Sequence, residues 1–379
     1  MKLLFIAESY PTSAQADLTG GVEARDFYTA SRLAQNHQVT VITGSRKGYS
    51  SHQNINGVTV IRVGLATTHA KRESLPARLS FSFLALPAAL RQNFDLIQGS
   101  NVITEAITYL VAALKNKPAV AVIPDIYIGS WIKNTNLITG LIGEFLESIV
   151  ISRPWDLIIS WSGTTKDKLI LYRANPKIIK VIGAGVDTAA IAALKAPKFS
   201  RPTITFAARL VKYKRAQDLI YAINILKDDI PDIQAKIIGI GPELDQLRQL
   251  RHQLKLADSV EFLGFIKKHQ DVTKTIKQSH LFCLPSVVEG FGLVTIEALA
   301  CSVPYVNSRI PSTLEVTHHS KGGLLFNPKS PQDLAQQAKK LLTDPKLYQS
   351  KQQEGQELIR HYSWDKVVRQ TEKAFQALL

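Results

Sequence analysis

The segment 285–298 combines two carboxylates with a glycine turn. An apolar strand is expected just before it, at Leu281–Leu284, and a helix just after the turn. The turn amides, Gly290 to Val294, would then point along the helix dipole towards a phosphate. Glu289 lies on the turn, and Glu297 lies about one helical turn into the helix. Carboxylates on both sides of an anion site suit a sugar nucleotide, which has hydroxyls at each end and phosphates in the middle; the simpler alternative is ordinary helix capping.

A second candidate follows the strand expected at Thr203–Ala207. Four cations occur there within seven positions: Arg209, Lys212, Lys214 and Arg215. Arginine can hold a phosphate through two hydrogen bonds, and lysine acts as a mobile point charge. Cations beyond the carboxyl end of a strand therefore predict an anion site, and a solvated basic loop is the alternative.

A third candidate is Thr19-Gly20-Gly21-Val22-Glu23, just before a helix expected at Val22–Asn36. Gly20 and Gly21 let backbone N–H groups approach a ligand closely at a helix N-terminus, which suits a diphosphate. The segment lacks a full G-x-G-x-x-G fingerprint, and the preceding loop is too long for a dinucleotide turn. A plain turn at the start of a helix is the alternative.

The elements that must position these residues alternate between short apolar runs and longer amphipathic ones. Expected strands are Lys2–Ala7, Gln38–Thr43, Val58–Val63, Leu96–Gly99, Ala119–Ile123, Leu157–Trp161, Ile178–Ile182, Thr203–Ala207, Ala235–Ile240, Val260–Leu263, Leu281–Leu284, Pro304–Asn307 and Gly323–Phe326. Expected helices are Val22–Asn36, Asn101–Lys115, Ala216–Asp228, Glu243–Leu256, Asp271–Gln278, Val294–Ala300 and Pro331–Thr343. Apolar strands with helical crossovers predict α/β architecture with parallel sheets covered on both faces.

The chain of 379 residues is too long for one ordinary core and predicts two doubly wound, Rossmann-like domains. The periodicity breaks between Val186 and Pro202, so we expect an N-terminal domain at 1–185 and a C-terminal domain at 186–363. Doubly wound sheets bind ligands beyond the carboxyl ends of their strands. The expected site is a cleft where two such edges face each other.

Composition excludes several classes of protein. Cys283 and Cys301 are the only cysteines, which excludes a disulfide framework and favours a cytoplasmic location. The apolar start at Leu3–Ala7 is too short for a signal peptide, and no apolar run reaches the ~20 residues of a spanning helix. The formal net charge is +15, spread over both halves without interleaved aromatic residues. This spread-out distribution disfavours nucleic acid as a partner. The positive charge itself suits phosphorylated substrates or peripheral contact with an anionic membrane.

Two apolar segments, Ser74–Leu90 and Leu137–Ser152, have no role in the predicted site. In the second, large apolar residues recur at helical spacing and leave Glu144 and Glu147 outside the stripe. One interpretation is a helix that packs by this stripe on its own domain. The other is an interfacial helix that docks on a membrane.

Over nearly its whole length the chain resembles the family-4 retaining glycosyltransferases of the GT-B fold (glycosyl transferases group 1). The resemblance rests on motifs spread along the chain. They are Gly20-Gly21-Val22-Glu23, Arg209 with Lys214, Gly239-Ile240-Gly241-Pro242-Glu243, Phe262-Leu263-Gly264, Glu289-Gly290-Phe291-Gly292-Leu293-Val294 with Glu297, and Tyr362-Ser363-Trp364.

The resemblance implies a hexosyltransferase that moves a sugar with retention from a nucleotide diphosphate sugar, without a cofactor or a tightly bound metal. Arg209 and Lys214 would stabilise the departing diphosphate, Glu289 would bind the donor sugar, and Glu297 would bind the ribose. Donor phosphates would be held by Gly20, Gly21, Gly290, Phe291, Gly292, Leu293 and Val294. The acceptor would be a glycan or a lipid-linked molecule on the N-terminal domain, in cell-surface polysaccharide biosynthesis. The terminal helix, 364–379, would pack back on that domain.

The chain departs from the family pattern at one position. Many members carry a histidine after the strand equivalent to Ala119–Ile123, and here Pro124 stands there, followed by Asp125. This departure keeps a catalytically silent GT-B scaffold open. A nucleotide-sugar isomerase (epimerase) is a second alternative because it would share the fold, but it should carry further acid and base residues, and no clear set is visible. A nicotinamide dehydrogenase is disfavoured because neither half opens with G-x-G-x-x-G.

Overall fold

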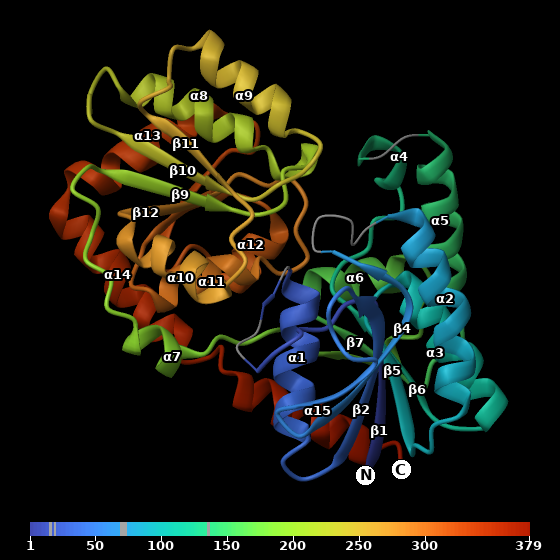
Figure 1. Cartoon of the computed structure of the whole chain (residues 1–379). Coiled ribbons are helices and arrows are strands. Elements are labelled where there is room, and N and C mark those ends of the chain that lie inside the picture. The colour runs from blue at the N-terminus through green and yellow to red at the C-terminus, as the bar shows by residue number, and fades with distance from the viewer. Residues whose placement is uncertain (15–16, 19, 69–73, 135–136) are drawn as a thin grey trace. The chain divides into compact units, whose positions relative to one another are not determined.

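The computed structural model describes residues 1–14, 17–18, 20–68, 74–134 and 137–379 (Figure 1). The chain divides into two compact units. The N-terminal unit comprises Met1–Ala184 together with Trp364–Leu379, and the C-terminal unit comprises Gly185–Ser363. Within the described ranges, no helix combines the length and the hydropathy needed to cross a membrane.

The N-terminal unit is built on a sheet with the strand order β3-β4-β2-β1-β5-β6-β7-β8. Its strands are β1 (Lys2–Ala7), β2 (Gln38–Arg46), β3 (His52–Ile55), β4 (Val58–Thr67), β5 (Leu96–Gly99), β6 (Ala119–Ile123), β7 (Leu157–Ser160) and β8 (Ile179–Val181). Neighbouring strands are parallel except β3 and β4, which form an antiparallel hairpin. The carboxyl ends of β1, β2, β4 and β5 therefore meet at one edge, where loops can build a site.

Helices cover this sheet on both faces, because side chains of a strand alternate between its two sides. The helices of the unit are α1 (Gly21–Leu33), α2 (Leu75–Leu90), α3 (Val102–Lys115), α4 (Trp131–Asn134), α5 (Leu137–Ile151), α6 (Gly163–Leu171), the 3₁₀ turn η2 (Pro176–Ile178) and α15 (Trp364–Gln376). Leu4 and Ile6 of β1 join a core with α2, α3 and α5. Leu3 and Phe5 are equally buried and point to the opposite face.

The terminal helix α15 packs on α1 within the N-terminal unit. The Trp364 ring stacks on Tyr28 with a centroid separation of 4.9 Å. Arg32 Nε donates to Asp365 Oδ1 at 3.0 Å. The terminal helix is thus part of the unit that also contains the beginning of the chain.

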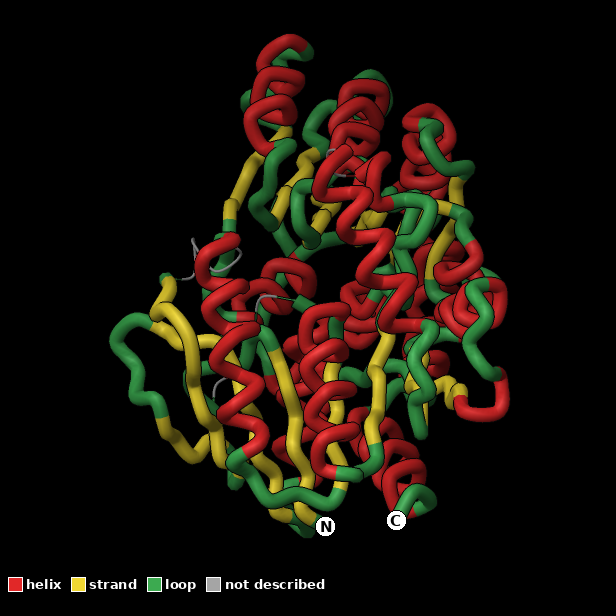
Figure 2. The backbone as a smooth tube through the Cα atoms, turned by 90° about the vertical axis from the view of Figure 1, so that its right-hand side faces the viewer, coloured by secondary structure: helices red, strands yellow, loops and turns green. Residues whose placement is uncertain are grey.

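The C-terminal unit contains a fully parallel sheet with the order β11-β10-β9-β12-β13-β14. Its strands are β9 (Thr203–Ala207), β10 (Gln234–Ile238), β11 (Val260–Gly264), β12 (Leu281–Leu284), β13 (Tyr305–Ser308) and β14 (Gly323–Phe326). Its helices are α7 (Thr188–Ala193), the 3₁₀ turn η3 (Lys212–Lys214), α8 (Ala216–Leu226), α9 (Leu244–Gln253), α10 (His269–Gln278), α11 (Leu293–Ala300), α12 (Pro311–Val316), α13 (Pro331–Thr343) and α14 (Pro345–Ile359). Figure 2 shows the strands of the sheets in yellow between red helices.

The expected pattern of parallel sheets is confirmed, with one addition. The polar strand β3 was not expected, and it pairs antiparallel with β4 through a turn at Asn56-Gly57. Both turn residues have positive φ, 52° and 83°, as a tight type I′ hairpin requires. Asn-Gly between two strands is the sequence signal that indicates this hairpin.

Candidate active site

The loop that carries Arg209 is held against the loop after β10 by two glycines. A Cβ added at Gly239 would lie 1.9 Å from the Ala208 carbonyl oxygen, and one at Gly241 would lie 2.2 Å from the Leu210 carbonyl oxygen. Only glycine allows this approach without a backbone shift. The two glycines thus fix the backbone on either side of Arg209, just beyond the carboxyl end of β9.

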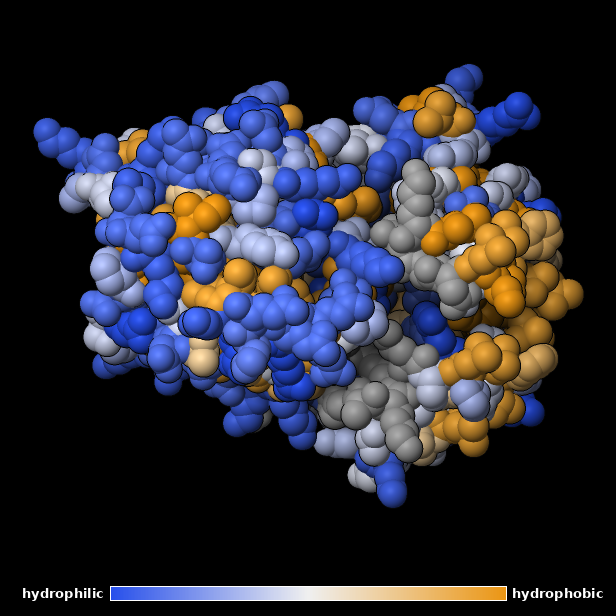
Figure 3. All heavy atoms as spheres, turned by 90° about the horizontal axis from the view of Figure 1, so that it is seen from above, coloured by the Kyte–Doolittle hydropathy of each residue, from blue (hydrophilic) through white to orange (hydrophobic). Residues whose placement is uncertain are grey.

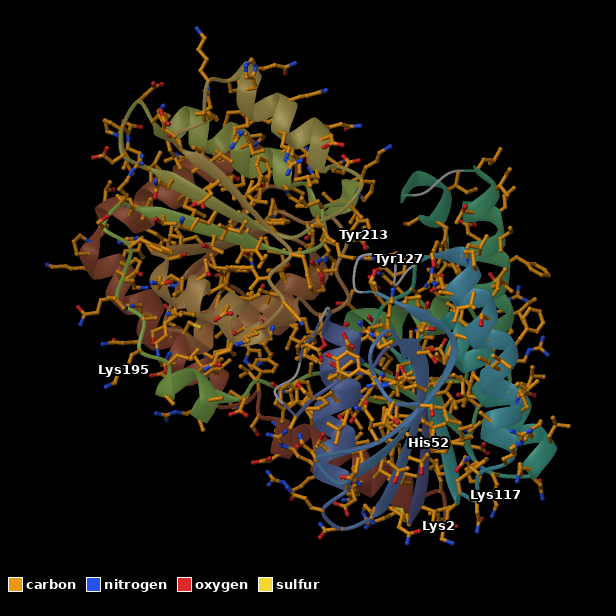
Figure 4. All side chains as sticks on the ribbon, viewed as in Figure 1. Lys2, His52, Lys117, Tyr127, Lys195 and Tyr213 are labelled. Carbon is orange, nitrogen blue, oxygen red and sulfur yellow. The ribbon has the colours of Figure 1, made fainter. Side chains whose placement is uncertain are left out.

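Tyr213 is a contact shared by two of the four cations of this loop, Arg209 and Lys214. Arg209 Nη2 donates to the Tyr213 hydroxyl at 3.3 Å, and Lys214 Nζ lies 5.4 Å from the centroid of the same ring. The Tyr213 carbonyl also accepts a hydrogen bond from Val287 N at 2.9 Å, which ties the loop after β9 to the loop after β12. Figure 4 shows Tyr213 beyond the end of the sheet. No sequence motif marks Tyr213 for this role.

Lys214 and Glu289 form an ion pair between these two loops. The Ser286 hydroxyl donates to the same carboxylate oxygen, Oε1, at 2.9 Å. The two side chains keep 16% and 11% of their surface exposed, so a ligand can still reach them. The structure thus brings together Arg209, Lys214 and Glu289, the three predicted catalytic residues, at the carboxyl ends of neighbouring strands β9 and β12.

The glycine turn leads directly into α11. Gly292 has φ 76°, in the left-handed region, and precedes the first residue of the helix, Leu293. Asn307 fixes this arrangement from β13: its side chain accepts from Leu284 N at 2.8 Å and donates to Thr295 Oγ1 at 3.0 Å. The first N–H groups of a helix have no partner within it, so this N-terminus presents donors and a positive dipole end to an anion.

Two of the residues predicted to bind the donor through their backbone amides bury their side chains in the protein. Phe291 and Leu293 are 7% and 8% exposed. The Phe291 ring meets Tyr362 edge-on with a centroid separation of 5.8 Å. Their side chains stabilise the turn, and what they can offer a ligand is the backbone N–H.

Glu297 is buried in α11 next to His269, a residue that was not predicted from the sequence. His269 Nε2 and Glu297 Oε1 lie 2.9 Å apart, whereas Glu297 Oε2 has no hydrogen-bond partner among the described residues. Burial lowers the pKa of His269, but the charge of Glu297 and its hydrogen bond outweigh burial and raise the pKa above its ordinary value. One carboxylate oxygen is therefore held by His269, and the other can accept from a ligand hydroxyl. No local motif marks His269, because it is far from Glu297 in the sequence.

Gly20 and Gly21 lie in the N-terminal unit, at the start of α1. Gly20 is extended, with φ −175°, and a Cβ added there would meet no atom of the described residues within 4 Å. Thr19 of the same motif lies outside the described residues. The structure thus leaves open space beside Gly20, as close approach of a ligand requires.

Polar side chains also converge at the carboxyl edge of the N-terminal sheet. Arg78 of α2 forms a bidentate ion pair with Glu8, which follows β1, and the longer bond, Nη2 to Oε2, measures 3.1 Å. Asn101 Nδ2 donates to the same oxygen at 3.4 Å. Glu8, Arg78 and Arg46 line a small pocket at this edge. This Glu8–Arg78 pocket was not predicted, since its members are far apart in the sequence.

The loop after β6 carries Pro124 where many family members have histidine. The Pro124 carbonyl accepts from Thr165 Oγ1 at 3.2 Å. Asp125 is buried and lies 2.7 Å from Lys168 Nζ. Glu147 of α5 accepts from Tyr127 N at 3.1 Å and from Trp131 Nε1 at 2.7 Å. Hydrogen bonds and an ion pair to side chains of α5 and α6 thus hold this loop in place.

No set of three histidine, cysteine or acidic residues in the described ranges is arranged to hold a metal ion. His318 and His319 follow α12 in the left-handed conformation, with φ 43° and 63°. The two cysteines, Cys283 and Cys301, are buried and free.

Two doubly wound units, with a cationic loop, a glycine turn and two carboxylates at one sheet edge, define a glycosyltransferase of the GT-B fold. The family described as "Glycosyltransferase Family 4" matches residues 19–190, and "Glycosyl transferases group 1" matches residues 192–358. The chain belongs to this family of hexosyltransferases.

Individual relatives agree with this assignment. The chain is 26% identical over 370 residues to the phosphatidylinositol N-acetylglucosaminyltransferase gpi3 subunit of Schizosaccharomyces pombe, covering 95% of this chain and 78% of that protein. Matches to three other curated relatives span 60%, 43% and 19% of the relative's length.

Solved structures show the same fold. Sucrose-phosphate synthase from Thermosynechococcus elongatus superposes with a TM-score of 0.83 at 18% identity, covering 100% of this chain and 99% of that chain. Anabaena HepE in complex with UDP-glucose superposes with a TM-score of 0.78 at 18% identity, covering 100% of both chains.

Proposed function

We propose that the enzyme transfers a hexosyl unit, with retention, from a nucleotide diphosphate sugar to a glycan or lipid-linked acceptor. The observation that carries the proposal is the convergence of Arg209, Lys214, Glu289 and the N-terminus of α11 at one edge of the C-terminal sheet. Related proteins support it: one is named for transfer of N-acetylglucosamine, and HepE was crystallised with UDP-glucose.

Arg209 and Lys214 would act on the departing diphosphate. Charge builds up on the leaving phosphate oxygens in the transition state, and fixed cations beside them stabilise that charge. The N–H groups of Gly290 to Val294 would contribute at the start of α11, and those of Gly20 and Gly21 at the start of α1. Since the cations can neutralise the diphosphate, we expect no tightly bound metal and no cofactor.

The two carboxylates would hold the hydroxyl groups at the ends of the donor. Glu297 Oε2 is buried and unpartnered among the described residues, and a ribose hydroxyl would satisfy it. Glu289 would bind hydroxyls of the sugar while Lys214 stays beside it. The leaving diphosphate itself would help to deprotonate the acceptor, so no protein base is required.

The acceptor would bind to the N-terminal unit. The Glu8–Arg78 pocket offers the carboxylate of Glu8 and the guanidinium groups of Arg46 and Arg78, which together suit the hydroxyls of a sugar or polyol. Placing the enzyme in the cytoplasm, in peripheral contact with an anionic membrane, would give it access to lipid-linked acceptors of cell-surface polysaccharides.

Thermal-shift measurements against a panel of nucleotides and nucleotide sugars test the donor site. A ligand at ~100 times its Kd stabilises the fold by about 2.7 kcal/mol, which is a visible shift. We expect a shift with one nucleotide diphosphate sugar, and loss of that shift in Arg209→Ala. Arg201→Ala is the matched control, because Arg201 precedes the amino end of β9 and bonds to Asp232 and Asp258 carbonyls.

Either of two results would overturn the donor assignment. Absence of a shift with every nucleotide sugar would favour a catalytically silent scaffold. Equal shifts in Arg209→Ala and Arg201→Ala would place the donor elsewhere. Conversion of the donor into an epimer without an acceptor would instead identify an isomerase.

A further inference from the structure

Helix α5 presents its apolar side to solvent, which reverses the usual arrangement of a surface helix. Its inward side carries glycines and carboxylates: a Cβ at Gly140 or Gly143 would lie 2.6 Å from α4, and Glu147 bonds to the loop after β6. Its outward side carries large apolar residues that are between 41% and 72% exposed. They are Leu137, Ile138, Leu141, Ile142, Phe145 and Leu146. The interpretation that this stripe packs on its own domain is therefore wrong.

The apolar surface continues over α2 and α3, since α3 packs against both α2 and α5. Exposed residues of these helices are Leu75, Leu79, Phe83, Leu84, Leu110 and Leu114. Figure 3 shows hydrophobic residues gathered along one side of the molecule over α2 and α5. We call this surface the α2–α3–α5 face. Monomeric soluble proteins rarely expose an apolar patch this continuous unless it meets a partner or a membrane.

Among the described residues, the exposed charges on these three helices and directly after them all have one sign. Glu105 and Glu147 are buried and Glu144 is half-buried, so no carboxylate of these three helices is exposed. The exposed ionisable side chains on the helices and on the two residues that follow each of them are cations. They are Arg91, Lys115, Lys117 and Arg153. A broad apolar surface with a basic rim is the composition of helices that lie in the interface of anionic bilayers.

We propose that the α2–α3–α5 face docks the N-terminal unit on an anionic lipid bilayer. Its apolar side chains enter the boundary between headgroups and acyl chains, and its rim cations contact lipid phosphates. A second copy of the chain fits this face less well, because a two-fold interface would place the same basic rim against itself. The consequence of docking rests on the proposed function. Because α2 also supplies Arg78 to the Glu8–Arg78 pocket, docking brings that pocket close to acceptors anchored in the membrane.

Vesicle flotation of the full chain tests the docking face. The probes are vesicles of phosphatidylcholine alone and of phosphatidylcholine mixed with phosphatidylglycerol. The test variant replaces three highly exposed residues, Phe83→Ser, Ile138→Ser and Phe145→Ser, none of which lies in the proposed donor or acceptor site. The matched control replaces two exposed apolar residues on other elements, Tyr221→Ser in α8 and Leu379→Ser at the C-terminus.

We expect the wild-type chain and the control to float with the anionic vesicles, and the triple variant to bind them at least tenfold more weakly, a loss of about 1.4 kcal/mol. Equal flotation of the triple variant and the wild type would overturn the proposal. So would a wild-type dimer that the triple variant converts to monomers, since a second copy would then cover the face.

The donor thermal shift, measured on the same variants, separates this proposal from the proposed function. The triple variant should keep the shift seen with the wild-type chain, which also shows that it is folded. Loss of flotation with an intact shift supports docking alone. Flotation by a wild-type chain that binds no nucleotide sugar would support docking and contradict the proposed function.

Discussion

Lys214 and Glu289, which are 75 positions apart in the chain, form an ion pair across the ends of neighbouring strands β9 and β12. Each residue follows its strand by a few positions, so parallel strands bring both to the same edge. Ser286 holds the shared carboxylate oxygen from the same loop as Glu289. The pair thus places the cation of Lys214 beside the Glu289 carboxylate, which can accept hydrogen bonds from sugar hydroxyls, before any sugar donor is bound.

Lys214→Met and Glu289→Gln should each lower the rate of transfer by at least ~10²-fold, the scale of losing one charge-stabilising group. The double variant should lose less than the product of the two, because residues in contact are not independent. Initial rates of nucleotide diphosphate release, measured with donor and acceptor in excess, give all three values.

The matched control is another ion pair of the same sheet, Lys236 with Glu261, which joins β10 to β11 away from the carboxyl edge. Lys236→Met should leave the rate unchanged. Losses smaller than about tenfold in both Lys214→Met and Glu289→Gln would place the chemistry at another site.

Gly241→Ala should destabilise the fold and weaken donor binding together. The new Cβ would lie 2.2 Å from the Leu210 carbonyl oxygen, so the loop that carries Arg209 must move. Overpacking of this kind costs on the order of 1–3 kcal/mol. Urea unfolding measures the free energy of unfolding, and the thermal shift measures donor binding. Gly20→Ala is the control for stability, because no atom of the described residues lies within 4 Å of its Cβ. An unchanged unfolding midpoint in both variants would show that the loop yields without strain.

The sheets could be predicted from the sequence because buried parallel strands are apolar throughout. Leu96–Gly99 and Leu281–Leu284 match their strands residue for residue. Strand β3 was missed because its residues are polar and it lies at the edge of the sheet. The orientation of α5 could not be predicted, since helical spacing defines an apolar stripe but does not say whether protein or a membrane covers it.

The motif residues could be predicted because strand, turn and helix follow one another in the sequence around Glu289 and Arg209. Contacts between distant segments could not. Tyr213 was visible between Arg209 and Lys214, but its bond to the loop after β12 depends on which strands are neighbours. His269 meets Glu297 only because α10 packs against α11. Long-range packing, which no local pattern encodes, thus supplies the residues that support the motif.

His269→Asn should lose stability relative to the wild-type chain in a pH-dependent way. The pKa of His269 is raised in the folded state by Glu297, against the effect of burial. The stabilisation is therefore complete below about 6.5, the unfolded value, and disappears as the pH rises through the folded value. We expect a difference on the order of 1 kcal/mol at the acidic end, measured by urea unfolding at a series of pH values. A difference that grows with rising pH would contradict the pairing of a histidine cation with Glu297.

Comparing Glu147→Gln with the wild-type chain should show how burial of the Glu147 carboxyl group changes stability with pH. Burial raises the pKa of Glu147 to about 7, against the hydrogen bonds from Trp131 and Tyr127. The protonated group therefore favours the folded state below about 4.3, the unfolded value, and this advantage is lost as the pH rises through about 7.

Glutamine cannot ionise but can still accept both hydrogen bonds. The free energy of unfolding of the wild-type chain should therefore fall relative to Glu147→Gln as the pH rises from about 4.3 to about 7, by on the order of 1–3 kcal/mol. Urea unfolding of both chains at matched pH values measures the difference. Parallel pH profiles would mean that Glu147 ionises as easily in the folded chain as in the unfolded one, so that holding the loop after β6 imposes no electrostatic penalty.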